Sequence, residues 1–147
     1  MNKDSKLSGV LHILLHMAEV NDPVTSETMA KMMQTNPVVI RRILAGLRKQ
    51  GYVRSEKGHG GGWSLARDVG SVTLYDIYIA VGSPTILAIG NRSESTACLV
   101  EKAVNSAMDQ AFQDAEALLL KRFREVTLAE LSSNVHQHLR GQNSTHE

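Results

Sequence analysis

Residues 36–67 read NPVVIRRILAGLRKQGYVRSEKGHGGGWSLAR and carry the patterns of a helix, a short strand, a glycine-rich turn and a second short strand. They contain seven basic residues and one acidic residue, a net charge of +6. The whole chain of 147 residues has 16 basic and 15 acidic residues, so the remainder has nine basic against fourteen acidic residues, a net charge of −5. A nearly neutral total therefore hides a basic segment of the kind that contacts phosphates.

The helix of this segment has clear signals at its start. Asn36 is a good N-cap, and Pro37 suits the first helical position because its missing N–H has no partner there. One face is apolar at helical spacing and should contact a core; it comprises Ile40, Ile43, Leu44 and Leu47. The opposite face comprises Val38, Arg41, Arg42, Ala45 and Arg48. Arg can read guanine edges and Val can contact a thymine methyl, so this face is a candidate for base recognition.

Residues 52–54 and 63–65 alternate like short strands around a turn with four glycines in six positions, from Lys57 to Gly62. Glycines such as Gly60 let a backbone approach a DNA groove closely, with Lys57 and His59 as the side chains that reach into it. The other interpretation of residues 36–67 is an ordinary amphipathic helix followed by a loose hairpin with solvated charges.

Two further helices are predicted before this segment, over residues 6–20 and 27–34, with Thr25 or Ser26 as the second N-cap. Thr28 lies in the first turn of the second helix, where its hydroxyl could hold a DNA phosphate. Three helices followed by a hairpin predict a winged helix-turn-helix, so the fold class is mainly α with a small β-hairpin wing. After it, Thr73 and Asp76 form a capping-box pattern for a helix over residues 74–81.

Residues 97–125 contain no Gly or Pro and predict a helix about 40 Å long at 1.5 Å per residue. Its apolar stripe is wider than this chain can cover, which favours a homodimer through residues 97–125; packing within one subunit is the alternative. We therefore expect a DNA-binding domain over residues 1–84. Residues 85–147 would form the dimerisation helices, with a possible sensor loop, a capping box at Thr127 and a fraying tail.

Several classes of protein are disfavoured by the totals. No apolar run is long enough to span a membrane, and the start MNKDSKLSG lacks the apolar centre of a signal peptide. A single cysteine fits a reducing cytoplasm, which is the expected location. We find no P-loop, HExxH, GxSxG, metal quartet or paired carboxylates, so an enzyme is not expected, and neither catalytic nor metal residues are assigned.

The motifs NPVVIRRILAGLRKQGYVRSEKGHGGGWSLARD, VTLYDIYIAVG and TACLVEKAVNSAMDQAF resemble the BadM/Rrf-two family of bacterial transcription regulators over nearly the whole chain. The resemblance implies a homodimer with crossed long helices that binds imperfect palindromes in double-stranded DNA. One recognition helix would enter each major groove, and the wing would enter a minor groove. By position, Asn36, Val38, Arg41 and Arg42 fall where the family reads DNA, and Lys57 falls where its wing inserts a basic side chain.

Cluster-binding members of the family carry three cysteines in the segment that matches residues 86–98, whereas this chain has only Cys98. An iron–sulfur cluster normally needs four ligands, mostly thiolates, so no cofactor is expected. In some relatives a residue of the partner's first helix completes the site, which makes His12, His16 and Glu19 the remaining candidates. The two histidines could chelate a metal, but such a pair is more often structural or solvated.

Cys98 is the candidate redox sensor, because a helix start favours the reactive thiolate; a small buried hydrophobe is the open alternative. A small effector could instead bind near Trp63, Tyr75 and Tyr78, which could equally be core residues. The leading hypothesis is a sequence-specific DNA-binding regulator, most simply a repressor, whose effector is unknown. The alternative is a winged-helix protein-interaction module that meets an acidic protein through the +6 segment.

Overall fold

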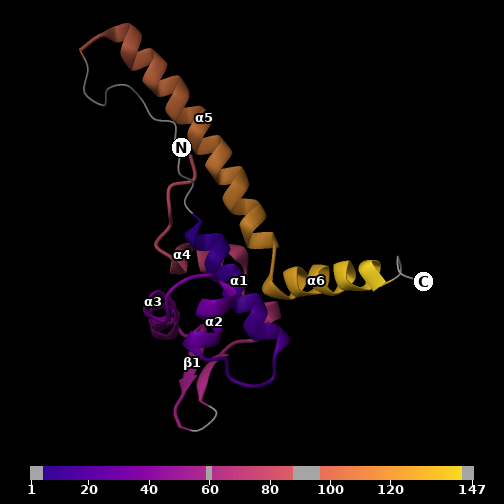
Figure 1. Cartoon of the computed structure of the whole chain (residues 1–147). Helices are drawn as coiled ribbons and strands as arrows, with labels where there is room; N and C mark the ends of the chain where they lie inside the picture. The colour runs from indigo at the N-terminus through magenta and orange to yellow at the C-terminus, as the bar shows by residue number, and fades with distance from the viewer. Residues whose placement is uncertain (1–4, 59–60, 88–96, 144–147) are drawn as a thin grey trace.

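A computed structural model of the chain describes residues 5–58, 61–87 and 97–143. Its described elements follow the order helix, helix, helix, hairpin, short helices and two long helices (Figure 1). They are α1 (Lys6–Glu19), α2 (Ser26–Met32), α3 (Pro37–Lys49), β1 (Val53–Glu56), β2 (Gly62–Leu65), η1 (Val69–Ser71), α4 (Leu74–Ala80), α5 (Leu99–Glu125) and α6 (Leu128–Asn143). The mainly helical fold with a two-stranded wing and a long helix near the C-terminus is confirmed.

Helices α1 to α4 and the hairpin form a head around one aliphatic core. The completely or almost completely buried side chains come from all parts of the head and from the start of α6, and they include Val10, Ile13, Leu14, Met29, Ile40, Leu44, Leu47, Val53, Ile77 and Leu128. Three of them, Ile40, Leu44 and Leu47, belong to the predicted apolar face of α3, while Ile43 packs at the edge of the same core. The core therefore fixes which face of α3 remains exposed.

The predicted caps are present. The Thr25 hydroxyl accepts a hydrogen bond from the Thr28 amide at 3.1 Å, and the Asn36 side chain accepts one from the Val38 amide at 2.8 Å. Thr73 and Asp76 exchange both bonds of a capping box. Helix α2 begins one residue before the predicted start and ends two residues before the predicted end, because Gln34 takes a positive φ of 53°.

Strands β1 and β2 pair antiparallel, with Val53 opposite Leu65 and Ser55 opposite Trp63. The strands extend further toward the turn than predicted, to Glu56 and Gly62. The hairpin is also attached to the head by a backbone bridge: the amide of Val24 donates to the Trp63 carbonyl at 2.9 Å, and the amide of Trp63 donates to the Val24 carbonyl at 2.8 Å. This isolated bridge at Val24, just before α2, therefore holds the wing in place relative to α2.

The end of α5 returns the chain to the head. The amide of Leu74 donates to the Val126 carbonyl, and the amide of Leu128 donates to the Val72 carbonyl, both at 2.9 Å. Helix α6 then lies against α1 and η1. Glu19 of α1 accepts a hydrogen bond from the Ser132 hydroxyl at 2.7 Å and lies 3.1 Å from Nε2 of His136. The last helix therefore has its own packing against the head.

Helix α5 differs from every helix of the head. Its 27 residues project away from the head on the side opposite to the hairpin (Figure 1), and none of them is buried. At its base, Phe123 contacts Tyr78 edge to face at a centroid distance of 5.9 Å. None of the described helices is apolar and long enough to cross a membrane. The division of the chain into residues 1–84 and 85–147 stays a prediction.

Candidate nucleic-acid interface

The exposed face of α3 combines cations with small apolar groups, as the sequence predicts. Arg41, Arg42 and Arg48 are exposed, and so is Val38, which keeps 53% of its surface accessible. The opposite face of α3 is buried in the core through Leu44 and its neighbours. The exposed side chains of α3 therefore cannot turn inward unless the head unfolds. This face has the residue types that read base edges and bind phosphates.

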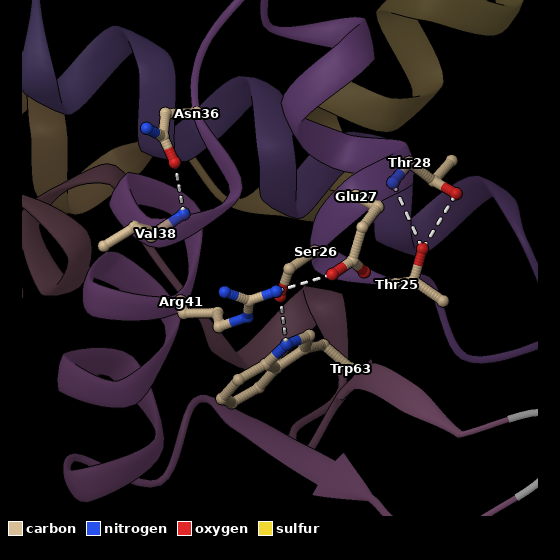
Figure 2. A network of polar contacts seen from close by, with 8 residues as sticks. All are labelled: Thr25, Ser26, Glu27, Thr28, Asn36, Val38, Arg41 and Trp63. Atoms are coloured by element: carbon tan, nitrogen blue, oxygen red, sulfur yellow. Dashed lines mark hydrogen bonds and ion pairs between the residues drawn. The ribbon is translucent and has the colours of Figure 1, made fainter.

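The N-termini of α2 and α3 place polar groups beside that face (Figure 2). Asn36 is exposed, and its amide oxygen serves as the α3 cap, which leaves the amide nitrogen as its side-chain donor. Thr28 is exposed at the start of α2, and its hydroxyl lies 2.9 Å from that of Thr25. Both predicted contact residues are therefore at the surface, at the N-termini of the two helices.

An ion pair joins the two helices. Nη2 of Arg41 lies 2.5 Å from Oε1 of Glu27, and both side chains are more than half exposed. A hydrogen bond from its own backbone amide and then the Arg41 guanidinium lower the pKa of Glu27, so its carboxylate is charged at neutral pH. A negative charge therefore lies within the cationic surface, beside one of its predicted base-reading residues.

The hairpin extends the surface from the other side. Lys57 is exposed near its tip, whereas His59 and Gly60 lie outside the described residues. Arg48 donates to the Ser55 hydroxyl at 3.3 Å and lies over the Trp63 ring at 5.9 Å, which connects α3 with both strands. Helix α3 and the hairpin therefore present their cations together.

Two other cations of the +6 segment have partners within the protein. Arg67 donates to the carbonyls of Gln50 and Gly51, at 3.3 and 3.2 Å, and lies 4.6 Å from the centroid of the Tyr52 ring. It thus satisfies the end of α3. Arg54 lies 3.5 Å from Glu56 on β1. Net charge along the sequence therefore overstates the charge that is available to a partner.

Two of the glycines that the sequence suggests for close approach to DNA are required by the hairpin itself. A Cβ on Gly62 would lie 2.7 Å from the Val24 carbonyl oxygen, and a Cβ on Gly61 would lie 2.4 Å from the Glu56 carbonyl oxygen. Both distances are too short for a side chain. These glycines allow the hairpin to turn and to dock on the head.

The three aromatic residues of the predicted effector pocket lie in two separate groups of contacts. Trp63 donates from Nε1 to the Ser26 hydroxyl at 3.0 Å, between α2 and the hairpin. Tyr78 donates to the Pro84 carbonyl at 2.9 Å, and Tyr75 packs under Arg124 of α5 at 4.1 Å. Burial raises the pKa of Tyr78, as expected for a phenol held at a helix junction. The tyrosines and Trp63 therefore support different parts of the fold.

Several surface depressions among the described residues have the size of a small-ligand site, and two of them bear on the fold. One of about 540 Å³ lies between the start of α1, α3 and the end of α4, and Arg42, Ile43 and Gly46 contribute to its wall. The other, of about 410 Å³, lies between α1, α4, the end of α5 and α6, and its lining includes Leu11, His12 and Phe123. The second is almost entirely apolar and lies at the base of α5.

Cys98 is exposed and occupies the N-cap position of α5, where its side chain makes no capping hydrogen bond. Its own subunit therefore does not bury Cys98, and the roles of a redox sensor and of a small hydrophobe covered in an assembly both stay predictions. His12 and His16 are adjacent on α1, with their Nε2 atoms 2.8 Å apart. Glu19 instead binds α6.

A match to the Rrf2 family, described as "Iron-dependent Transcriptional regulator", covers residues 4–134. The chain therefore belongs to the Rrf2 family of transcriptional regulators.

Iron does not fit the donors that one subunit offers. The chain has a single cysteine, and no group of three His, Cys, Asp or Glu side chains gathers among the residues that the structure describes. Thiolates are the usual ligands of iron–sulfur clusters, and one is too few.

Known proteins agree with this assignment. The chain is 26% identical over 132 residues to YwnA of Bacillus subtilis (strain 168), named as an HTH-type transcriptional regulator, covering 90% of this chain and 98% of YwnA. The crystal structure of a protein from Lactobacillus plantarum, named as a transcriptional regulator, matches with a TM-score of 0.74 at 25% identity, covering 96% of this chain and 98% of that chain. The B. subtilis global cysteine regulator CymR shares the fold, with a TM-score of 0.68 at 20% identity, over 91% of this chain and 98% of CymR.

Two features of the surface are absent from the sequence prediction. Glu27 is the acidic partner of Arg41, and Val24 is the backbone partner of Trp63. Each pair joins residues far apart in the chain, so no local spacing rule connects them. The only signal is that Glu27 is an acidic residue within the first turn of a helix next to the basic segment.

Proposed function

We propose that the protein is a sequence-specific DNA-binding regulator that acts as a homodimer on a palindromic operator and represses transcription there. The observation that carries the proposal is the exposed face of α3, with Arg41, Arg42 and Val38 side by side and the Lys57 hairpin next to it. An α-helix of this kind fits the major groove, and a basic hairpin beside it can reach the adjacent minor groove.

The homodimer is supported by α5. Its exposed apolar side chains form a long surface that the described residues do not cover, made by Leu99, Val100, Val104 and Leu118. A surface of this extent on a projecting helix is typical of a subunit interface. Two-fold symmetry through α5 would present two α3 helices to two half-sites, which is why the operator should be palindromic.

In vitro selection from a library of random DNA duplexes tests sequence specificity. We expect one enriched palindromic duplex, with an affinity that falls steeply with salt because lysines and arginines displace counterions from the phosphates. Arg41→Ala and Arg42→Ala should weaken binding about tenfold, and Arg140→Ala, at the far end of α6, should leave it unchanged. Failure to enrich any sequence, or binding that is indifferent to salt, would contradict the proposal.

Sedimentation equilibrium tests the homodimer. Wild type should sediment as a dimer and the double variant Val104→Asp, Leu118→Asp as a monomer, because two carboxylates would be buried in an apolar interface. Trp63 fluorescence provides the control, since it reports the head and should not change. A monomeric wild type would remove the reason for a palindrome.

The switch is a further part of the proposal. Exposure at the N-cap of α5 allows oxidation of Cys98, and a change there could alter the separation of the two heads through α5. Mild oxidant should then release the selected duplex from wild type but not from Cys98→Ser. Equal release from both, or none, would direct the search to a small effector.

The alternative function is a docking module for an acidic protein. It predicts that the protein binds heparin or other polyanions as well as any duplex, with no enrichment of a sequence. The exposed Val38 on the same face as Arg41 and Arg42 favours DNA, because an apolar group beside arginines suits a thymine methyl next to guanine in a major groove.

A further inference from the structure

We propose that Glu27 is a positioning residue for DNA recognition: it holds the guanidinium of Arg41 for a base edge and keeps it from binding phosphates indiscriminately. The inference rests on the proposed function and concerns sequence discrimination by the same surface. Glu27 belongs to α2 and Arg41 to α3, so the pair connects the two helices of the helix-turn-helix at its exposed side (Figure 2).

The geometry of the pair leaves Arg41 able to bind a base. The contact with Oε1 of Glu27 uses Nη2, one of three guanidinium nitrogens, which together carry five N–H donors. Bidentate recognition of guanine requires a planar guanidinium in a fixed orientation. An arginine at an exposed position has many rotamers. If one rotamer is fixed before DNA binds, less side-chain conformational entropy is lost on binding.

Glu27 is itself held by a rigid support. The Thr25 hydroxyl caps α2, and Ser26, which is 95% buried, accepts a hydrogen bond from Trp63. Trp63 is in turn bonded to Val24 through both backbone groups. The residues on either side of Glu27 are therefore fixed to the hairpin and to the head, and α2 packs against α3. The carboxylate of Glu27 therefore reaches Arg41 from a fixed backbone position.

The charge of Glu27 also matters for discrimination. A carboxylate within a cationic surface repels phosphates, so a register that brings the DNA backbone to this point is disfavoured relative to one that brings a base edge. Arg41 without its partner would gain freedom to contact any nearby phosphate. Loss of Glu27 should therefore improve binding to arbitrary DNA and weaken the preference for one sequence.

The experiment measures the affinities of wild type, Glu27→Gln, Arg41→Ala and the double variant for the duplex enriched by wild type and for a scrambled duplex of the same composition. Glu27→Gln should reduce the ratio of the two affinities about fivefold, the order of a strong exposed ion pair. It should also steepen the salt dependence on scrambled DNA. In the Arg41→Ala background the same substitution should not change the ratio further.

Glu130→Gln is the matched control, because Glu130 is an exposed glutamate in the first turn of a helix, as Glu27 is, but lies on α6. It removes the same charge and should not alter the ratio. A purely structural link between α2 and α3 would change the thermal stability of Glu27→Gln and leave the ratio of the two affinities constant. The ratio therefore separates a role in DNA recognition from a structural one.

The two proposals fail in different ways. A wild type that does not distinguish the enriched from the scrambled duplex overturns the proposed function and this inference with it. A wild type that discriminates, with a ratio unchanged in Glu27→Gln, overturns the inference alone. The inference is also overturned if Glu27→Gln changes the ratio of affinities equally with and without Arg41, or if Glu130→Gln changes the ratio as much. Either result would mean that only the net charge of the protein matters.

Discussion

The head and α5 contain apolar stripes of similar spacing, but among the described residues only the stripe of the head is covered. In α3, Leu44 is completely buried by residues of its own chain, whereas in α5 Leu118 keeps 70% of its surface exposed. The pattern of apolar residues in a sequence shows that a face needs cover. It does not show whether the cover comes from the same chain. The described residues cover the stripe of the head, and the proposed cover of α5 is a second subunit.

The largest expected effect is a difference between substitutions in the two stripes. Leu44→Ala should destabilise the head by about 3 kcal/mol, because it leaves a cavity in a closely packed core. The loss should be the same at every protein concentration. Leu118→Ala should instead lower stability only through weaker association, so that its effect depends on protein concentration. Urea denaturation at several protein concentrations provides the measurement.

That distinction disappears if the two variants behave alike. A loss on Leu118→Ala that is independent of concentration would mean that α5 is covered by its own chain. A concentration-dependent loss on Leu44→Ala would mean that the head is not complete without a second subunit.

A smaller effect tests whether the hairpin is closely packed against the head. Gly62→Ala should cost about 2 kcal/mol, since its Cβ would lie 2.7 Å from the Val24 carbonyl oxygen and the bridge between hairpin and head would have to shift. Gly46→Ala is the control within α3: nothing lies within 4 Å of its Cβ, and alanine should stabilise the helix by about 0.5 to 1 kcal/mol. Thermal unfolding should therefore move in opposite directions for the two variants; a shift in the same direction would show that the hairpin is not docked on Val24.

The smallest effect concerns the surface of the head. Because the pKa of Glu27 is lowered in the folded state, its contribution to stability is present at neutral pH and is lost as the pH falls through the folded pKa. Wild type should therefore lose stability relative to Glu27→Gln only below the ordinary range of a glutamate pKa. Thermal unfolding from pH 7 to pH 3 measures this; a difference that stays constant over that range would show that the carboxylate has no favourable partner.

Much of the head follows from local signals in the sequence. Asn36 and Thr73 cap the helices that the sequence predicts for them, and Thr25 is the cap among the two candidates for α2, because a cap depends only on neighbouring residues. The bridge from Val24 to Trp63 and the packing of α6 on Glu19 were not predicted. Both depend on how distant segments meet in space, which no periodicity encodes.

The candidate interface shows the same limit. The arginines of α3 could be assigned to the exposed face because Leu44 and Leu47 had to be buried, and helical geometry then determines the opposite side. The charge of the segment was less informative, since Arg67 binds the end of α3 and Arg54 pairs with Glu56. The acidic partner of Arg41 could be found only from the packing of α2 against α3.

The most direct test of the central claim, that the face of α3 and the hairpin bind DNA, is to map amide chemical-shift changes when the selected duplex is added to isotope-labelled protein. We predict that the changes gather at residues 25–28, along the exposed face of α3 and on the hairpin, and that the middle of α5 does not respond. Changes centred on α5 or α6, with the face of α3 unaffected, would contradict the account.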